Sequence, residues 1–180
     1  MSNPSSDPLV SIIMRSHNEG WALRQTLAGL QNQEYTNWEL IVIDSGSTDD
    51  SVDLIRKANP KHFIQIKAED YNPSRVMNHG MRLAESPYAI FLNADATPQG
   101  PRWLRPLVTP LLEPNNAAVF GRQIPRPDCR AVAASGCGSN AATRSCGPGG
   151  CKIESLAGDR LASPGARIGT SGVHVGFVGK

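Results

Sequence analysis

Three short polar segments of the sequence carry most of the side chains that could bind a charged or polar ligand. They are Arg15-Ser16-His17-Asn18-Glu19, Asp44-Ser45-Gly46-Ser47 and Asn93-Ala94-Asp95. Each one follows an apolar run of the kind that forms buried strands. Polar turns are common in any α/β domain, so one such segment alone indicates little. Three of them, after the first, second and fourth expected strands, favour a ligand site, because ligands of open α/β sheets bind beyond the carboxyl ends of the strands.

The apolar runs predict a series of buried strands with helices between them. Strands are expected over residues 9–14, 39–43, 63–66, 88–92 and 117–120. Helical spacing and capping signals predict helices over about 21–30, 52–55, 73–83 and 103–112, the last interrupted by Pro106 and Pro110. This alternation predicts an α/β fold, with a mostly parallel, Rossmann-like sheet flanked by helices and joined by right-handed crossovers.

Composition excludes several other classes of protein. The 180-residue chain has a net charge of +2, and its Lys and Arg residues are scattered rather than gathered in runs, which gives no reason to invoke nucleic acid. Residues 1–8 are polar and predict a disordered N-terminal tail rather than a signal peptide. No apolar run reaches the roughly 20 residues of a membrane span. We therefore expect a cytoplasmic protein that could associate peripherally with the inner face of the membrane, and the oligomeric state stays open.

The alternating pattern stops near residue 131. Residues 131–180 are crowded with Gly, Ala and Ser and predict an irregular tail. Disorder and a frame-shifted or misjoined gene end are both open explanations. The four cysteines fall late in the chain, and their spacings of seven, eight and four intervening residues do not match the closely spaced pairs of structural zinc sites, even with His174 in reserve. These cysteines are Cys129, Cys137, Cys146 and Cys151.

Taken in order, the polar segments resemble the motifs of the family 2 glycosyltransferases, which have the GT-A fold. The similarity covers about residues 9–130, and is carried by residues 10–19, 41–49 and 92–98. The last two strings, together with residues 121–127, are most similar to bacterial rhamnosyltransferase-like members. The resemblance implies a nucleotide-sugar-binding domain over 9–130. It also implies inverting transfer from dTDP-rhamnose or a UDP-sugar to a saccharide or lipid-linked acceptor.

The resemblance assigns the base of the donor to the first two segments. The loop from Arg15 to Glu19 would hold the base, with His17 stacked on it. Asp44, followed by Ser45 and Gly46, would accept a hydrogen bond from the pyrimidine imide, a contact that a carboxylate makes well. Two plainer interpretations stay open: His17 as a solvated loop histidine, and Asp44 as a capping aspartate.

The third segment stands where the family has Asp-x-Asp, which holds a divalent cation on the leaving diphosphate. The resemblance implies Mg²⁺ or Mn²⁺, with Asp95 as its ligand. Asn93 departs from the motif and offers only a neutral oxygen, to ribose or to a metal-bound water, so weaker metal affinity is expected. Ala94 lies between them in the nucleotide-binding string.

A further pattern, Arg-x-x-Asn-x-Gly, is formed by Arg75, Asn78 and Gly80. By resemblance, Arg75 contacts the diphosphate, since a guanidinium can bind phosphate oxygens bidentately. A surface arginine is the alternative. Glycine costs about 1 kcal/mol against alanine inside a helix, so we expect Gly80 to pack closely against the sheet.

The catalytic base is not identifiable. In this family it is an acidic residue of the acceptor half, and the corresponding region offers only Asp128, Glu154 and Asp159. Two hypotheses therefore stay open: a working transferase with an unusual C-terminal part, or a truncated, inactive remnant that only binds nucleotide sugar and metal. A sugar nucleotidyltransferase is disfavoured, because the segment after the first strand is not a Gly-rich phosphate loop.

Overall fold

A computed structural model describes residues 7–125, 151–154 and 174–177 of the chain. The first half alternates strands with helices. Its elements are β1 (Val10–Ser16), α1 (Gly20–Gln31), β2 (Trp38–Asp44), α2 (Ser51–Ala58), β3 (His62–Gln65), a 3₁₀ helix (Ala68–Asp70), α3 (Pro73–Leu83) and β4 (Tyr88–Asn93). The later elements are shorter: β5 (Ala96–Pro98), α4 (Arg105–Val108), a second 3₁₀ helix (Thr109–Leu112), β6 (Ala118–Val119), β7 (Arg122–Pro125), β8 (Cys151–Glu154) and β9 (His174–Phe177).

The main sheet has six strands in the order β3-β2-β1-β4-β9-β6. The first four are parallel to one another, which confirms the predicted mostly parallel α/β sheet. The register pairs Ser16 with Asp44 and Arg15 with Asn93. These pairings bring the ends of β1, β2 and β4 to one edge of the sheet, as the sequence predicts for its three polar segments.

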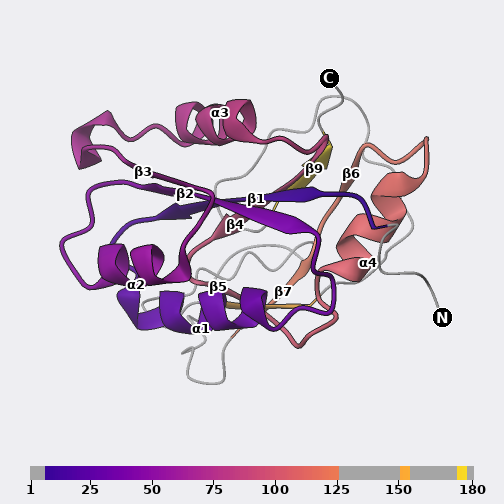
Figure 1. Cartoon of the computed structure of the whole chain (residues 1–180), viewed down its shortest axis with the longest axis horizontal. Helices are drawn as coiled ribbons and strands as arrows, with labels where there is room; N and C mark the ends of the chain where they lie inside the picture. The colour runs from indigo at the N-terminus through magenta and orange to yellow at the C-terminus, as the bar shows by residue number, and fades with distance from the viewer. Residues whose placement is uncertain (1–6, 126–150, 155–173, 178–180) are drawn as a thin grey trace, which may run out of the picture.

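Helices cover both faces of the sheet (Figure 1), with α1 and α2 on one face and α3 on the other. Alternate residues of β1 divide between these layers, because successive side chains of a strand point to opposite faces. Ile12 and Met14 belong to the larger core cluster, which includes Leu23 and Leu27 of α1. Ile13 belongs to the smaller cluster on the α3 side. Full burial of one such side chain stabilises the fold by about 1.5–3 kcal/mol.

The start and the packing of α3 follow the expectations. The Asn72 side chain caps the helix by accepting a hydrogen bond from the Arg75 backbone N–H at 3.1 Å, and Pro73 occupies the first turn. Gly80 is buried, and a Cβ there would lie 2.4 Å from Cγ2 of Ile13. The close approach of α3 to β1 therefore requires glycine at this position.

The region after β4 differs from the expectation of one interrupted helix. Only Arg105–Val108 is α-helical, and Thr109–Leu112 continues as a 3₁₀ helix. Pro110 explains the change, because it has no N–H for the bond that would continue the α-helix. The strand β5 was not expected either.

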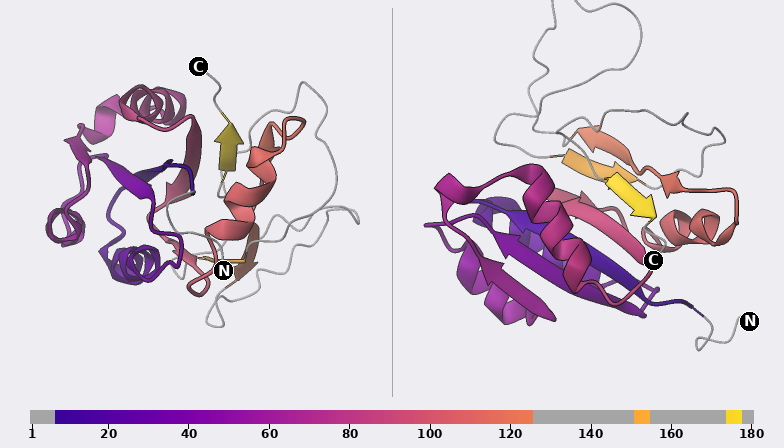
Figure 2. Two further views of the ribbon diagram at one scale, coloured as in Figure 1. Left: turned by 45° about the vertical axis from the view of Figure 1, so that its right-hand side comes forward. Right: turned by 90° about the horizontal axis from the view of Figure 1, so that it is seen from above.

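Two strands lie beyond residue 131, where the sequence predicts none. β9 inserts between β4 and β6, antiparallel to both. β8 lies between β5 and β7 in a second, three-stranded sheet, and Figure 2 shows both segments beside the main body. Each has only four residues, too few to show a period, and each gains its hydrogen bonds from a strand distant in the sequence. Both strands lie within the region for which an irregular tail is expected, and the rest of that region, residues 131–150, 155–173 and 178–180, lies outside the described residues, so the tail stays a prediction.

The structure also describes the last two residues of the expected N-terminal tail. Residues 1–6 of the expected tail lie outside the described residues, but Asp7 and Pro8 are held in place. The Asp7 carboxylate accepts from Arg105 at 2.7 and 3.1 Å, and the Pro8 carbonyl oxygen accepts from the Tyr35 hydroxyl at 2.5 Å. No helix within the described residues is long and apolar enough to cross a bilayer.

Candidate functional site

A cavity of about 350 Å³ opens at the edge where β1, β2 and β4 end. Four of its lining residues come from β1 and the loop that follows it, and the others follow β2, β3 and β4. The lining residues are Arg15, Ser16, His17, Glu19, Ser45, Ala68, Tyr71, Asn93 and Asp95. All of these except Ala68 and Tyr71 belong to the three polar segments predicted to form a ligand site. Those two lie in and just after the 3₁₀ helix that follows β3, and no motif in the sequence marks them.

Hydrogen bonds join the first loop (residues 17–19) to the second loop (residues 45–50). Nδ1 of His17 lies 2.8 Å from the Ser45 carbonyl oxygen, which requires the proton on Nδ1. Asn18 has a positive φ of 53°, donates from its backbone N–H to Ser47 Oγ at 2.9 Å, and accepts from the Thr48 backbone N–H at 2.8 Å. The two loops therefore form one connected unit.

Asp44 is fully buried and does not line the cavity. Its carboxylate accepts hydrogen bonds from the backbone N–H of Ser47, at 2.9 Å, and from the Ser47 hydroxyl. Gly46 between them has a φ of +75°, and a Cβ there would lie 3.1 Å from the Ala68 backbone nitrogen. Asp44 thus holds its own turn; it does not cap α2, which begins at Ser51 after the N-cap residue Asp50, and its contact with a base stays a prediction.

Arg15 is fixed at the cavity by two neighbours. Its Nε donates to Oδ1 of Asn93 at 2.6 Å, and its Nη1 donates to the Tyr71 hydroxyl at 2.9 Å. The guanidinium therefore presents positive charge beside Asp95 and Glu19, the two acids of the cavity lining. A fixed guanidinium of this kind suits phosphate oxygens.

The electrostatics of the cavity centre on Glu19. Burial and the nearby Asp95 carboxylate raise the pKa of Glu19 to about 7, against the opposing effects of a backbone hydrogen bond and Arg15. Its Oε2 is buried without a hydrogen-bond partner. The hydroxyls of Ser16 and Ser45 are likewise buried and unpartnered. Such groups cost free energy unless something satisfies them, so the cavity is arranged for a polar ligand.

The remaining predicted residues lie elsewhere. Arg75 and Asn78 are exposed on α3 and do not line this cavity. Ala94 is buried, and its backbone N–H donates to the Arg15 carbonyl oxygen at 3.1 Å. Asp128 and Asp159, two of the three candidate bases, lie outside the described residues, as do three of the four cysteines.

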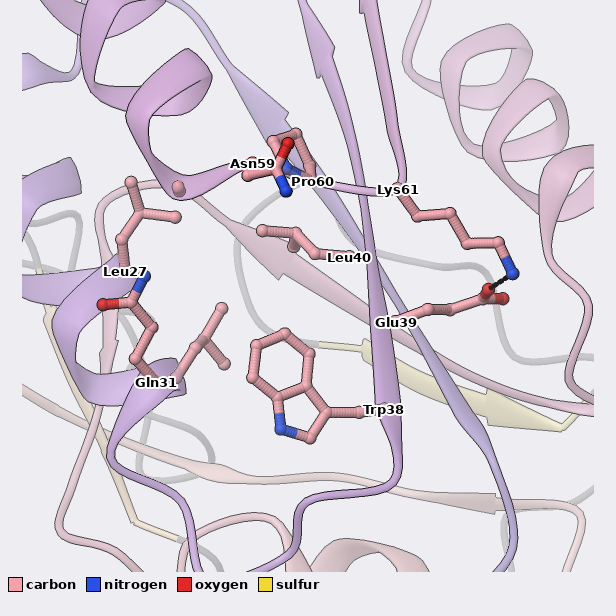
Figure 3. Close-up of a pocket in the computed structure, with 10 residues that line it drawn as sticks. Leu27, Gln31, Trp38, Glu39, Leu40, Asn59, Pro60 and Lys61 are labelled. Atoms are coloured by element: carbon pink, nitrogen blue, oxygen red, sulfur yellow. Dashed lines mark ion pairs between the residues drawn. The ribbon is translucent and has the colours of Figure 1, made fainter.

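A second cavity, of about 330 Å³, lies at the opposite end of β2 (Figure 3). Its lining includes the apolar side chains of Trp38, Leu40 and Pro60. Its charged groups already satisfy each other, because Lys61 Nζ lies 2.7 Å from Glu39 Oε2 and pairs with Glu85 as well. Oε2 of Glu39 is buried and has no hydrogen bond, but this ion pair compensates its charge, whereas the buried oxygens of Ser16, Glu19 and Ser45 in the first cavity have no such partner.

The sequence of the chain matches the model of a known protein family. The model of "Glycosyl transferase family 2" matches residues 11–135, which is more than half of the sequence. The chain belongs to this family. The resemblance noted from the motifs is thereby confirmed, and rhamnosyltransferases are among its distant relatives.

Curated relatives match part of the chain. An uncharacterised glycosyltransferase of Haemophilus influenzae is 36% identical over 91 residues, covering 49% of this chain and 36% of that protein. The O-antigen chain rhamnosyltransferase WbaN of Salmonella anatum is 30% identical over 128 residues, covering 70% of this chain and 40% of that protein. The chain thus spans well under half the length of these family 2 relatives.

Solved structures show the same fold at low identity. The mannosyltransferase PcManGT from Pyrobaculum calidifontis, in complex with GDP-Man and Mn²⁺, matches with a TM-score of 0.58 and 24% identity, over 69% of this chain and 38% of that one. Glucosyl-3-phosphoglycerate synthase from Mycobacterium tuberculosis, in complex with Mn²⁺, UDP and phosphoglyceric acid, matches with a TM-score of 0.53 and 17% identity, over 68% of this chain and 44% of that one. These matches confirm the GT-A-like α/β fold.

Proposed function

We propose that the chain binds the nucleotide diphosphate of a sugar donor in the cavity at the ends of β1, β2 and β4. The observation that carries this proposal is the set of buried, unpartnered oxygens of Ser16, Glu19 and Ser45 around one space. Hydroxyls and carboxylates without partners need a polar ligand, and Arg15 beside them supplies charge for a phosphate. Family membership adds the chemical class, a nucleotide sugar.

The loops assign parts of the donor to parts of the site. The base would lie against the first loop, with His17 and Asn18 exposed to meet it, on the turn that Asp44 and Gly46 shape. A pyrimidine donor, dTDP-rhamnose or a UDP-sugar, is proposed because rhamnosyltransferases and a UDP-bound enzyme occur among the relatives. Arg75 and Asn78 would meet the donor only where it extends past the described cavity.

The reaction would be inverting transfer of the sugar to a saccharide or lipid-linked acceptor. An acceptor hydroxyl attacks the anomeric carbon from the face opposite the diphosphate, the bond to the diphosphate oxygen breaks, and the hydroxyl proton passes to a base. Mg²⁺ or Mn²⁺ would be held at Asp95, and when bound it neutralises charge on the leaving diphosphate. Arg15, anchored by Asn93 and Tyr71, orients the phosphates. No described residue is assigned as the base.

The cavity fits such a cation in its donor set. Within the described residues, no group of three or more His, Cys, Asp or Glu side chains could enclose a metal ion. The cavity nevertheless has two carboxylates in its lining, and a cation on a diphosphate takes its other ligands from phosphate and water. We place the reaction on the cytoplasmic side, where nucleotide sugars are available.

Calorimetric titration with UDP, dTDP and GDP, with and without Mn²⁺, tests the proposal. We expect one of the pyrimidine nucleotides to bind, and the variant Arg15→Gln to bind it at least about tenfold more weakly, a loss of about 1.4 kcal/mol. Arg24→Gln is the matched control, because Arg24 is an exposed arginine of α1 outside the cavity. An absence of nucleotide binding would overturn the proposal.

Donor hydrolysis then separates the two versions of the function. Release of sugar from dTDP-rhamnose or a UDP-sugar supports an active transferase. Metal-dependent binding without any turnover supports a remnant that only binds the donor, an alternative favoured by the short coverage of the relatives.

A further inference from the structure

The Asn-x-Asp segment after β4 leaves the expected cation with a single carboxylate. Oδ1 of Asn93 already accepts a hydrogen bond from Nε of Arg15 at 2.6 Å. An amide oxygen engaged in this way, and close to a guanidinium, is a poor ligand for a divalent cation. Mg²⁺ and Mn²⁺ prefer carboxylate oxygens, so Asp95 alone would bind weakly.

Glu19 lines the same cavity from the loop that follows β1. Its loop follows β1, the strand that pairs with β4, and Glu19 and Asp95 both line the space. Oε2 of Glu19 is buried and has no hydrogen-bond partner. Two carboxylates that line one space repel each other, and a divalent cation between them would attract both.

The other acids of the two loops hold the structure together. The carboxylate of Asp44 accepts from Ser47, and that of Asp49 accepts from the backbone N–H groups of Gly20 and Ser51 at 2.9 and 3.0 Å. Asp50 pairs with Arg24 at 3.6 Å. Among the acids of these loops, Glu19 is the one with a buried oxygen left for a ligand.

Two buried hydroxyls provide an independent indication of a ligand at this place. Ser16 and Ser45 are 2% and 3% exposed, line the same cavity, and have no partner for either hydroxyl. Hydroxyl oxygens at a cation site hold the water molecules of its coordination shell. The cavity thus combines two carboxylates with neutral oxygens, a donor set that hard cations take.

We propose that Glu19 is the second carboxylate ligand of the divalent cation held by Asp95, taking the part that Asn93 cannot take. The two ligands come from neighbouring parallel strands rather than from one Asp-x-Asp segment. This assignment rests on the proposed function for the identity of the cation and its diphosphate, but it does not depend on turnover.

Mn²⁺ binding to the full chain tests the assignment directly, measured from the electron paramagnetic resonance signal of free Mn²⁺. The variants are Glu19→Gln, Glu19→Asp and Asp95→Asn, with Glu113→Gln as the matched control at an exposed glutamate outside the cavity. We expect Glu19→Gln to weaken Mn²⁺ binding by at least about tenfold, a scale that even outer-shell partners reach. Glu19→Asp should recover part of the loss, and the control should match the wild type.

A compensating variant gives a readout that a merely structural role would not move. Asn93→Asp, introduced into the Glu19→Gln protein, restores a second carboxylate and should restore Mn²⁺ affinity. Unfolding midpoints establish that each variant is folded. Wild-type Mn²⁺ affinity in folded Glu19→Gln, or no Mn²⁺ binding by the wild type, overturns the assignment.

UDP and dTDP binding without metal separates this failure from that of the proposed function. If a nucleotide binds but Mn²⁺ binding does not depend on Glu19, the proposal of donor binding stands and the assignment of Glu19 as a ligand falls. If Mn²⁺ binding depends on Glu19 but no nucleotide binds, the assignment stands and the donor function falls.

Discussion

Replacement of Gly80 by alanine tests the packing that positions α3 on the sheet. The new Cβ would lie 2.4 Å from Cγ2 and 3.3 Å from Cγ1 of Ile13, whereas carbon atoms in contact prefer about 3.5–4.0 Å. Ile13 is 3% exposed and β-branched, so it has little freedom to turn away. Overpacking costs about 1–3 kcal/mol, and a contact as short as 2.4 Å belongs to the upper part of that range, about 2–3 kcal/mol, while the helix propensity of alanine returns about 1 kcal/mol. We expect a net loss of about 1–2 kcal/mol.

Urea unfolding of the two proteins, followed by circular dichroism, measures this loss, which corresponds to a fall in Tm of about 2–8 °C. Gly29→Ala is the graded control, because its Cβ would meet Pro98 at 3.3 Å, a contact that small shifts relieve. The double variant Gly80→Ala/Ile13→Ala should lose less free energy of unfolding than the two single variants lose together, by at least about 0.5 kcal/mol. Stabilisation by Gly80→Ala, or simple additivity with Ile13→Ala, would refute the reasoning.

Three more expectations concern pH and backbone strain. The pKa of Glu19 is raised from 4.5 to about 7, so the folded state favours its protonated form. The free energy of unfolding of the metal-free wild type should therefore fall by up to about 3 kcal/mol as the pH rises from 4.5 to about 7. Urea unfolding of Glu19→Gln should lack this decline. Gly46→Ala should destabilise more than Gly100→Ala in the same assay, because both have φ near +75° but only Gly46 has a close neighbour; equal losses would contradict this. Burial alone would raise the pKa of Glu39, but hydrogen bonds from Lys61, Ser11 and the Glu85 backbone lower it. The stabilisation of the folded state by the ionised Glu39 is therefore present above pH 4.5 and lost as the pH falls through the lowered pKa. Lys61→Met should lower the urea midpoint at pH 7 and have little effect in strong acid.

The sequence predicted the parts of the fold that depend on local pattern. The runs of β1 and β2 are buried and rich in β-branched residues, that of β4 is apolar, and the Asn72-Pro73 pair fixes the start of α3 within one turn. These signals depend on neighbours in the chain, and they were sufficient to align the three polar segments at one edge.

Features that depend on distant partners were not predictable. The strands β8 and β9 are four residues each and acquire their structure from β5, β7, β4 and β6. Tyr71 lines the cavity because Arg15 reaches it across 56 positions of sequence. The hydrogen bond that the Asp44 carboxylate accepts from the backbone N–H of Ser47 was not predicted either, and its contact with a base stays a prediction. The nearness of Glu19 to Asp95 follows from the register of β1 with β4, which one sequence does not specify.

The hydrogen bonds between the first and second loops have a consequence for the thermodynamics of binding. Asn18 connects to Ser47 and Thr48 before any ligand arrives, so the conformational entropy of both loops is lost during folding rather than during binding. Donor binding then needs little backbone ordering, and the affinity reflects contacts and desolvation more than loop closure. The same bonds should slow hydrogen exchange at the Thr48 amide in the ligand-free protein to a rate set by local opening of the paired loops.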